Sequence, residues 1–316
     1  MTLDDIKDKI ENAESIVIFT HEKPDGDAIG SSLAFYIAMK KLEKNVDVII
    51  PHFPRDFKFL PFSNDAKVKP AFKKYDLAVA LDCGDINRLD DPDENFLKAK
   101  TRVNIDHHMS NGMFGDLNYV DPVSPACCQI LTGIFKYYKY DIDTDIATCL
   151  ITGIITDTGG FKYDGVTTET FEIASEFLSM GVNISKVYKE SMGRISKEKF
   201  ETRKLAADRV EFFENNRIAY SYITKNDMDK LHVDQNDLDG IVENARDIDG
   251  VEISIFLYET EKGFKASLRS NDYVNVSDIC LLFNGGGHIK AAGCTLPYSL
   301  DESKERILNA AKRFLK

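Results

Sequence analysis

The sequence lacks any apolar run long enough to cross a membrane, and its longest runs, such as residues 16–19 and 77–81, have the length of a strand. The N-terminal segment, MTLDDIKDKIENAES, is acidic and amphipathic, so it resembles neither a secretory signal nor a basic transit peptide. These absences argue against a membrane protein and predict a cytoplasmic location.

Cysteine pairs at metal-binding spacing are also absent. The six cysteines include no CxxC pair and follow no regular framework spacing, and several lie in apolar stretches. We therefore expect reduced cysteines in the core rather than disulfides or thiolate ligands.

A basic run that could hold long nucleic acid is missing too, and the net charge is −12. A short phosphate substrate remains compatible with this charge if bound cations supply the positive charge. Alternatively, the negative charge only keeps the surface soluble. The sequence also shows no internal repeat and no low-complexity tract.

The first half of the chain alternates strand and helix patterns. Strands are predicted at 15–20, 46–50, 76–82 and 102–105, and helices at 28–44, 125–138, 144–156, 167–180 and 183–192. Such alternation predicts an α/β domain whose parallel sheet is covered on both faces. Ligands of these sheets bind at the carboxyl ends of the strands.

The charged segment SKEKFETRKLAADRVEFF predicts a connecting helix followed by a smaller α/β domain. In that domain we predict strands at 217–223, 251–258 and 263–270, the last two forming a hairpin, and helices at 235–246, 275–283 and 301–315. The predicted organisation is a metal-binding catalytic domain at 1–185, a helical linker at 186–205 and a substrate-binding domain at 206–316.

Polar side chains that could bind a cation follow the first predicted strand. In IVIFT-HEKPDGDAIGSS, His21, Asp25 and Asp27 lie in a loop whose glycines permit a tight path into the next helix. Two aspartates two residues apart can both face a cation. Asp27 could instead serve only as a helix cap, and for this motif alone that interpretation is favoured.

Three further motifs also place acidic or histidine residues directly after an apolar segment. Asp82 ends the apolar segment LAVAL, where an unpaired buried charge would be costly. Asp106, His107 and His108 follow RVNI, although such a pair of histidines often marks only a surface turn. Asp157 follows an apolar stretch and precedes two glycines, as a helix-terminal aspartate also would.

A parallel sheet would gather six of these side chains on one edge: His21, Asp25, Asp27, Asp82, His107 and Asp157. Their oxygen and nitrogen donors, without thiolate, suit Mn²⁺ and related cations such as Mg²⁺ or Co²⁺. Two cations roughly 3.5–4 Å apart, bridged by a shared carboxylate, would form a clamp for phosphoryl displacement.

The second half contains a glycine-rich loop, FNGGGHIKAAG, at residues 283–293. Successive glycines let backbone amides approach an anion, and we predict that His288 opens a helix at 289–292 whose N-terminus favours negative charge. The loop is not a Walker motif because no GK[ST] follows, and a plain glycine-rich turn is the alternative. Upstream, Ser267, Arg269 and Ser270 offer hydroxyls and a guanidinium suited to phosphate, unless the arginine is merely solvated.

The motifs HEKPDGDAIGS, LDCGD, IDHH and ITDTGGF occur in the order of the DHH superfamily of phosphoesterases, which the chain resembles. The family takes its name from the triplet seen here as residues 106–108. The loop GGGHIKAAG resembles the signature of the first type of DHH-associated C-terminal domain. The resemblance covers nearly the whole chain and is closest to the short-oligonucleotide exonucleases (nanoRNases) that also dephosphorylate 3′-phosphoadenosine 5′-phosphate.

The resemblance implies two Mn²⁺ ions and a mobile second domain that closes over the substrate. It assigns one ion to His21 and Asp25, the other to Asp27, His107 and Asp157, and a bridging position to Asp82. His108 would lie near the scissile phosphate and assist proton transfer, while Asp106 would orient the site. The implied nucleotide-binding residues are Arg269, Ser270, Gly286, Gly287 and His288.

One position departs from the family pattern. After ITDTG the family often has Phe-Arg, whereas this chain has Phe161 and Lys162. Lysine does not make the bidentate phosphate contact of arginine. The departure leaves the metal ligands untouched but puts the substrate preference in doubt.

We therefore predict a metal-dependent phosphoesterase for short RNA or DNA oligonucleotides and 3′-phosphoadenosine 5′-phosphate, with no long nucleic acid or membrane partner. The nearest alternative is a phosphodiesterase for the linear dinucleotide of cyclic-di-AMP turnover. A family II pyrophosphatase is disfavoured because GGGH and SLRS belong to the other C-terminal type, and an exonuclease on long single-stranded DNA is disfavoured by the chain's size and acidity. A rival of another class is a non-catalytic nucleotide-binding module. A homodimer is compatible with the architecture.

Overall fold

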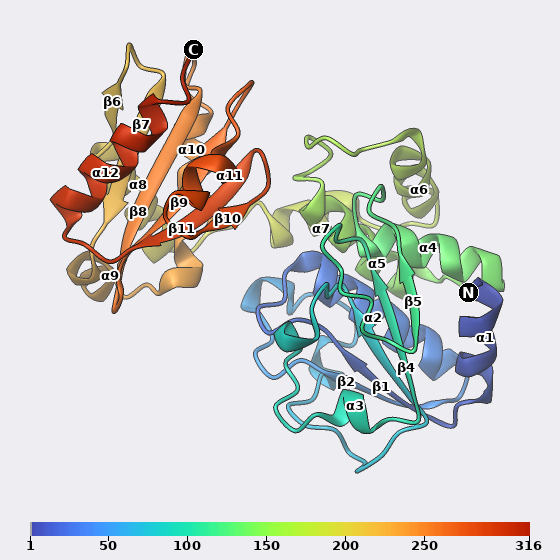
Figure 1. The fold of residues 1–316 in the computed structure, drawn as a ribbon. Coiled ribbons are helices and arrows are strands. Elements are labelled where there is room, and N and C mark those ends of the chain that lie inside the picture. Colours follow the sequence, from blue (N-terminus) through green and yellow to red (C-terminus); the bar gives the residue numbers. More distant parts are fainter. Residues whose placement is uncertain (1) are drawn as a thin grey trace. The chain divides into compact units, whose positions relative to one another are not determined.

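The computed structural model describes residues 2–316, which form two compact units divided between Arg194 and Ile195 (Figure 1). The first unit contains a five-stranded sheet and the second a six-stranded sheet. No helix within the described residues has the length and apolar character needed to span a bilayer. The predicted linker, 186–205, covers the end of a helix of the first unit and most of a helix of the second.

The sheet of the first unit is parallel throughout, as predicted, with strand order β2-β1-β3-β4-β5. Its strands are β1 (Ser15–Phe19), β2 (Asn45–Ile49), β3 (Leu77–Leu81), β4 (Thr101–Asp106) and β5 (Leu117–Val120). The sequence patterns identified the first four, whereas β5 was not predicted. The strand order reverses direction between β1 and β3, and in open parallel sheets this is the point where ligands bind.

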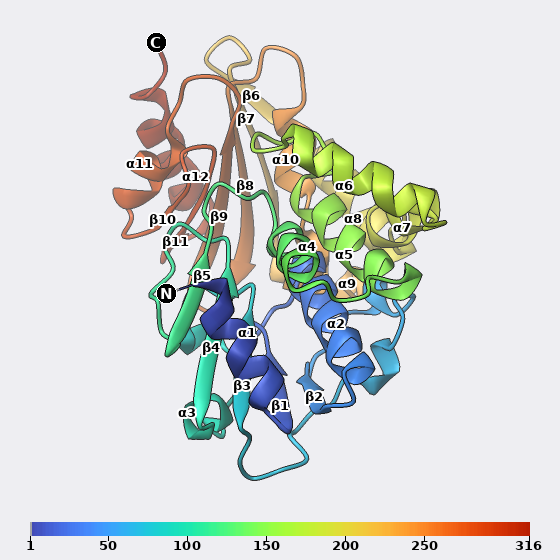
Figure 2. The same ribbon diagram turned by 90° about the vertical axis from the view of Figure 1, so that its right-hand side faces the viewer.

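Seven helices surround this sheet within the described part of the first unit: α1 (Leu3–Asn12), α2 (Gly26–Lys41), α3 (Asn95–Lys98), α4 (Cys127–Tyr138), α5 (Thr144–Asp157), α6 (Thr168–Ser179) and α7 (Ile184–Ser191). The main apolar core packs α1, α2, α4 and α5 against one face, and Figure 2 shows α2, α4 and α5 together on that side. The sheet is covered on both faces, as predicted, but most of the helices lie on one of them. The opposite face is covered by the short α3 and by loops, through side chains such as Tyr75 and Phe96.

The second unit has a mixed sheet of strand order β10-β11-β9-β8-β7-β6 in which only β7 and β8 run parallel. The strands are β6 (Glu211–Phe213), β7 (Ile218–Ile223), β8 (Ile253–Thr260), β9 (Gly263–Ser270), β10 (Gly286–Gly287) and β11 (Ala291–Leu296). The helices are α8 (Lys197–Asp208), α9 (Lys225–Leu231), α10 (Ile241–Arg246), α11 (Val276–Leu281) and α12 (Leu300–Lys312). Apolar residues of α11 and α12 pack on one face of the sheet, and those of α8, α9 and α10 pack on the other.

The helix predicted at 289–292 does not exist. Residues 291–296 form β11 instead, which pairs along its whole length with β9 and buries alternate side chains. This period of two is typical of a strand with one buried face, and the preceding glycines obscured it. The helix predicted at 235–246 is likewise interrupted, because Gly240 adopts a φ of 85° between a 3₁₀ turn (Gln235–Leu238) and α10.

A buried ion pair fixes the start of α9 in the second unit. Asp227 accepts hydrogen bonds from Arg209 Nη1 at 2.6 Å and from Thr224 Oγ1 at 2.6 Å. These bonds, above all those from Arg209, lower the pKa of Asp227 to about 2 from a usual value of 3.8. A carboxyl group with a lowered pKa stabilises the folded state above pH 3.8 and loses that contribution as the pH falls towards 2.

We therefore expect Asp227→Asn to reduce the free energy of unfolding by about 1 kcal/mol at pH 7, since solvent screens part of the ion pair. The difference from wild type should shrink between pH 4 and pH 2. Urea denaturation at several pH values measures it, with Asp229→Asn on the exposed face of α9 as control. A difference that stays constant down to pH 2 would contradict the assignment.

Candidate metal centre

The loop after β1 places the first predicted ligands at the N-terminus of α2. Asp25 is the N-cap: its Oδ1 accepts hydrogen bonds from the backbone N–H groups of Asp27 and Ala28, both at 3.1 Å. Its other oxygen lies 4.0 Å from His21 Nε2. The cap is therefore Asp25 and not Asp27, and capping leaves one carboxylate oxygen of Asp25 directed towards His21.

Asp27 is fully buried and is held by a helix that lies a hundred residues later in the chain. Its Oδ2 accepts a hydrogen bond from Cys127 N at 2.6 Å, and its Oδ1 accepts one from Cys128 N at 2.9 Å. These amides are the first of α4, which has no side-chain cap. The positive end of the α4 dipole thus faces the carboxylate and fixes its orientation.

Glycines let α2 and α5 approach closely enough for Asp27 and Asp157 to share one site. A Cβ atom on Gly30 would lie 2.5 Å from Cys149 O, and one on Gly153 would lie 2.5 Å from Asp27 Oδ1. Neither position has room for a side chain. The contact brings the end of α5, where Asp157 lies, to the start of α2.

Asp82 follows β3 at the centre of the site. Its φ of 51° places it in the left-handed region, which aspartate tolerates better than most residues, and its side chain is buried. Asp82 Oδ2 lies 3.8 Å from His21 Nε2, and Asp82 Oδ1 lies 3.4 Å from His107 Nε2. Neither Asp82 Oδ1 nor His21 Nδ1 has a hydrogen-bond partner within the described residues. An unpartnered buried carboxylate oxygen is costly unless a cation or an ordered ligand satisfies it.

His107 presents one ring nitrogen to three carboxylates. Its Nδ1 lies 3.2 Å from Ser124 O, which places a hydrogen on Nδ1 and makes Nε2 the nitrogen that a cation could bind. Nε2 lies 3.2 Å from Asp157 Oδ2 and 3.9 Å from Asp27 Oδ2. A backbone carbonyl that orients the second nitrogen is the usual arrangement around a metal-binding histidine.

All six side chains predicted as ligands thus meet at the carboxyl ends of the strands. They form three overlapping groups in which one donor atom of each member lies within 4.8 Å of the others: Asp82 with His107 and His108, His21 with Asp25 and Asp82, and Asp27 with His107 and Asp157. Asp82 and His107 each belong to two groups. The donors are carboxylate oxygens and imidazole nitrogens, and the arrangement could hold metal ions.

The electrostatics of the site show a local excess of negative charge. Burial, followed by repulsion from Asp27, raises the pKa of Asp82 to about 7, and the same two causes raise the pKa of Asp157 to about 9. Burial opposes a charge on His107, but the surrounding carboxylates outweigh it and raise the pKa of this residue to about 10. Burial also raises the pKa of Asp27. Three crowded carboxylates with raised pKa values are what bound cations would stabilise in their charged form.

A network of hydrogen bonds orients Asp106 and His108, the remaining members of the DHH triplet. His108 Nδ1 lies 2.7 Å from Asp106 Oδ1, and Asn111 Nδ2 donates to Asp106 Oδ2 at 2.6 Å. Asn111 Nδ2 also donates to Oδ1 of the buried Asn104 at 2.7 Å.

The hydrogen bond between His108 and Asp106 raises the pKa of His108. Burial alone would raise the pKa of Asp106, but the bonds from His108 and Asn111 lower it. Sequence analysis missed both asparagines.

In the second unit, the strand β9 separates the residues of the SLRS motif onto two faces. Arg269 is half-buried, and its Nε donates to Glu243 Oε1 at 2.9 Å. Ser267 shares this face, whereas Ser270 is buried on the other and donates to Val274 O at 2.7 Å. The period of two along a strand thus places Ser267 beside Arg269 and turns Ser270 inwards.

The other predicted nucleotide-binding residues lie in the hairpin that replaces the predicted helix. Gly286 and Gly287 form β10, and His288 lies in the exposed turn, where its N–H donates to Ala291 O at 2.8 Å. Gly287 has a φ of 147°, and a Cβ atom there would lie 2.5 Å from Ala291 O. No helix N-terminus contributes to this loop, so any anion there would be bound by the hairpin backbone and side chains.

A parallel α/β domain with overlapping carboxylate and imidazole groups at the carboxyl edge of its sheet defines a metal-dependent hydrolase. Residues 15–154 match the model of the DHH family N-terminal domain, and residues 215–316 match that of the DHHA1 domain. The chain belongs to the DHH family of phosphoesterases.

Relatives match this chain along nearly the whole length of both proteins. The chain is 34% identical over 309 residues to the bifunctional oligoribonuclease and PAP phosphatase NrnA of Thermus thermophilus, covering 95% of this chain and 90% of that one. It is 25% identical to the protein of the same name in Bacillus subtilis, over 93% of each. Among solved structures, an exopolyphosphatase-related protein from Bacteroides fragilis superimposes with a TM-score of 0.91 and 28% identity, over 99% of this chain and 96% of that one.

Proposed function

We propose that this chain hydrolyses short oligonucleotides to mononucleotides and dephosphorylates 3′-phosphoadenosine 5′-phosphate. The observation that carries the proposal is the sharing of Asp82 and His107 among three overlapping ligand groups, because shared ligands hold two cations close together. The names of the relatives from Thermus thermophilus and Bacillus subtilis support this choice of substrates.

In this proposal each candidate ligand binds the cation to which the family resemblance assigns it. His21 and Asp25 would hold one divalent cation, Asp27, His107 and Asp157 would hold the other, and Asp82 would be shared by both. The donor set suits Mn²⁺, with Mg²⁺ or Co²⁺ as alternatives. When bound, such a pair lowers the pKa of water and neutralises the charge that develops on the phosphate oxygens. The amides of Cys127 and Cys128 keep Asp27 in place before any cation arrives.

His108 is the proposed proton-transfer residue. Because its Nδ1 is bound to Asp106, its Nε2 remains available to the leaving oxygen of the substrate. Asp106 fixes the ring and stabilises its charged form. Arg269, with Ser267 beside it and the hairpin of Gly286, Gly287 and His288, is proposed to bind the nucleotide end of the substrate.

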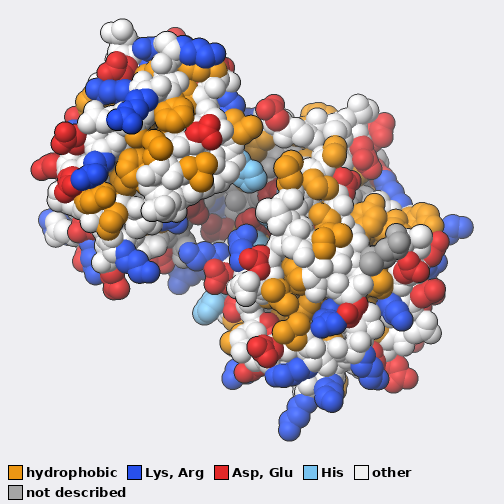
Figure 3. All heavy atoms as spheres, in the orientation of Figure 1, with side chains coloured by type: hydrophobic (Ala, Val, Ile, Leu, Met, Phe, Trp, Pro, Cys, Tyr) orange, Lys and Arg blue, Asp and Glu red, His pale blue; other side chains and the backbone are white. Residues whose placement is uncertain are grey.

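The distribution of surface charge supports a short substrate, and the state of the cysteines supports a reducing compartment. On the face shown in Figure 3, acidic and basic side chains are interspersed over each unit, rather than forming a continuous basic groove. All six cysteines are free and buried, which supports a cytoplasmic location. Lys162, where the family often has arginine, is exposed.

Hydrolysis of a panel of 5′-labelled dinucleotides tests the proposal, with 3′-phosphoadenosine 5′-phosphate and the linear dinucleotide pApA as separate substrates. We expect Mn²⁺-dependent release of mononucleotides that stops when EDTA is added. Selective turnover of pApA alone would favour the alternative role in cyclic-di-AMP turnover. Metal binding without turnover of any substrate would overturn the proposal in favour of a nucleotide-binding module.

The network around Asp106 leads to a prediction for Asn111. Asn111→Ala leaves Asp106 Oδ2 without its donor, so His108 loses part of its orientation while the metal ligands keep theirs. We expect kcat to fall about 10- to 100-fold, as for other residues that support a catalytic group. Steady-state kinetics and Mn²⁺ titration calorimetry measure the two effects, with the exposed Asn87→Ala as control. An equal loss of Mn²⁺ affinity would show that Asn111 supports the metal site instead.

Arg269→Ala should act mainly on binding. The guanidinium lies in the second unit and is proposed to contact a phosphate that does not react, so we expect KM to rise about tenfold with kcat nearly unchanged. Arg313→Ala, which removes an exposed arginine at the end of α12, serves as the control. A fall in kcat at constant KM would contradict this division of roles.

A further inference from the structure

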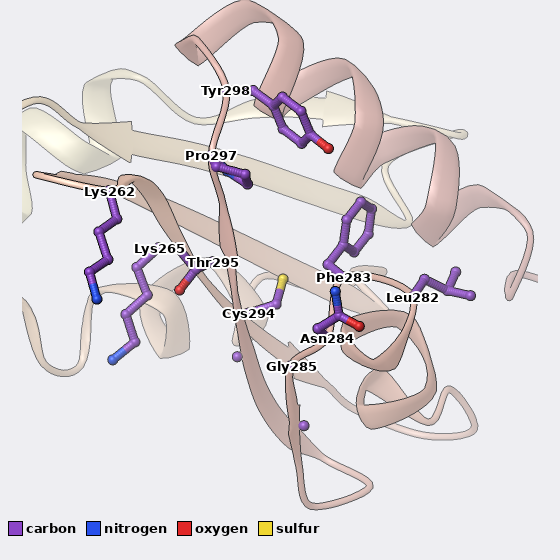
Figure 4. A pocket seen from close by; sticks show the side chains of 12 residues that line it. Lys262, Lys265, Leu282, Phe283, Asn284, Gly285, Cys294, Thr295, Pro297 and Tyr298 are labelled. Atoms are coloured by element: carbon purple, nitrogen blue, oxygen red, sulfur yellow. The ribbon is translucent and has the colours of Figure 1, made fainter.

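An open pocket of about 760 Å³ lies in the second unit at the edge of β11, beyond the short β10. Figure 4 shows Lys262 and Lys265 extending side by side on one flank of β11, with Phe283 and Asn284 on the other. Gly286 and Gly293 also line it. We call it the lysine pocket. It adjoins the glycine hairpin, but Lys262, Lys265 and Asn284 have no part in the function proposed above.

No acidic partner in the part of the chain that the structure describes neutralises the charges of the two lysines, whereas Lys304 and Lys312 of the same unit are paired. Lys304 pairs with Glu211 at 2.7 Å, and Lys312 pairs with Glu214 at 3.0 Å. Among the described residues no carboxylate lies within ion-pair distance of Lys262 or Lys265, and Lys265 Nζ lies 5.8 Å from the centre of the Tyr258 ring. Two unpaired ammonium groups in one pocket of a chain with a net charge of −12 favour an anionic ligand.

The position of Lys265 relates the pocket to the proposed nucleotide site. Lys265, Ser267 and Arg269 lie on the same face of β9, since Ala266, Leu268 and Ser270 are buried on the other. Four residues of strand separate Lys265 from Arg269 by about 14 Å. A ligand that begins at Arg269 and follows β9 therefore reaches the lysine pocket only if it extends past its first nucleotide.

The remaining lining of the pocket suits a nucleoside better than inorganic phosphate. Leu282 is 57% exposed at the rim, and Phe283 presents part of its ring beside it. Asn284 offers an exposed amide that can donate and accept hydrogen bonds. Apolar and aromatic surfaces bind bases by stacking, while ammonium groups bind the phosphates between them.

We propose that the lysine pocket binds a further phosphorylated nucleotide of an oligonucleotide substrate, beyond the one held at Arg269. The inference rests on the proposed function and narrows it: oligonucleotides of three or more residues use the pocket, whereas 3′-phosphoadenosine 5′-phosphate does not reach it. Discrimination by length then arises in the second unit, without any change at the metal ligands.

The test compares tri-adenylate with 3′-phosphoadenosine 5′-phosphate on the full chain carrying Lys262→Ala and Lys265→Ala together. Binding is measured by titration calorimetry in EDTA, and kcat/KM is measured in Mn²⁺. We expect the double variant to bind tri-adenylate about tenfold more weakly and the mononucleotide as wild type does. The slope of log affinity against log salt should fall by about 1.4 for tri-adenylate, or about 0.7 for each lost phosphate contact.

The matched control is Lys225→Ala with Lys230→Ala, which removes two exposed lysines from α9 and changes the net charge equally. Unchanged affinity and salt slope for tri-adenylate in the pocket variant, or an equal loss in the control, would overturn the inference. The EDTA measurement does not depend on turnover. An inactive wild-type chain that still shows the selective loss would therefore refute the proposed hydrolysis and retain the pocket.

Discussion

Asp82→Ala is expected to lower kcat/KM on dinucleotides by about a thousandfold or more, the largest effect of any single substitution in this chain. Asp82 is the carboxylate common to two of the three ligand groups, so its removal affects both proposed cations at once. The other candidate carboxylate ligands, Asp25, Asp27 and Asp157, belong to one group each. Steady-state kinetics with Mn²⁺ measure the loss, and metal analysis of the dialysed protein measures the number of ions retained.

Asp85→Ala is the matched control, because Asp85 belongs to the same LDCGD segment but is exposed and caps only a 3₁₀ turn. We expect it to keep nearly full activity. Asp82→Asn adds a test of folding: in EDTA it should be at least as stable as wild type, because it removes a buried charge crowded against Asp27. Retention by Asp82→Ala of more than a tenth of wild-type activity would refute a bridging role.

Gly153→Ala is expected to damage both stability and the metal centre, although alanine is the better helix former. The new Cβ atom would lie 2.3 Å from Cys128 Sγ and 2.5 Å from Asp27 Oδ1, and 2.9 Å from Asp27 Cα. Because the last of these contacts is to backbone, α2 and α5 must move apart. We expect a loss of about 1–3 kcal/mol in the free energy of unfolding, as for other overpacked sites.

The same displacement moves Asp27 away from His107 and Asp157, so Mn²⁺ affinity should fall about 10- to 100-fold. Gly133→Ala is the control, because Gly133 lies in the neighbouring α4 and a Cβ atom there meets nothing within 4 Å. That substitution should raise stability by up to about 1 kcal/mol. Denaturant unfolding measures the stability of both variants, and Mn²⁺ titration measures their metal affinity. Equal stability and equal Mn²⁺ affinity of the two variants would refute the packing argument.

The sequence was sufficient to predict that the six candidate ligands gather at one edge of the sheet, because this placement follows from local patterns. His21, Asp82 and His107 each follow an apolar strand, and the carboxyl ends of parallel strands share one edge. What could not be predicted are contacts between distant segments. Nothing in the sequence near Asp27 indicates that the amides of Cys127 and Cys128 bind it, since hydrogen bonds to backbone require no particular side chain.

The second unit was harder to predict because its structure also depends on pairing between segments that are distant in sequence. The register of β9 decides that Ser267 lies with Arg269 and that Ser270 is buried, and a shift by one residue would exchange them. The glycines before β11 suggested the start of a helix, whereas pairing with β9 makes residues 291–296 a strand. Asn111 donates to Asn104 and Asp106 of β4, but a single asparagine in a polar segment gave no sign of that role.

The carboxylate of Asp27 and its amide donors are separated by a hundred residues of chain. During synthesis on the ribosome, the N-terminal segment with His21, Asp25 and Asp27 emerges long before α4 and α5 exist. A nascent chain that ends before residue 127 lacks the amides that anchor Asp27, and one that ends before residue 157 still lacks the last carboxylate of the candidate site. The proposed cation binding therefore requires nearly complete translation of the first unit, so truncated chains should not bind divalent cations tightly.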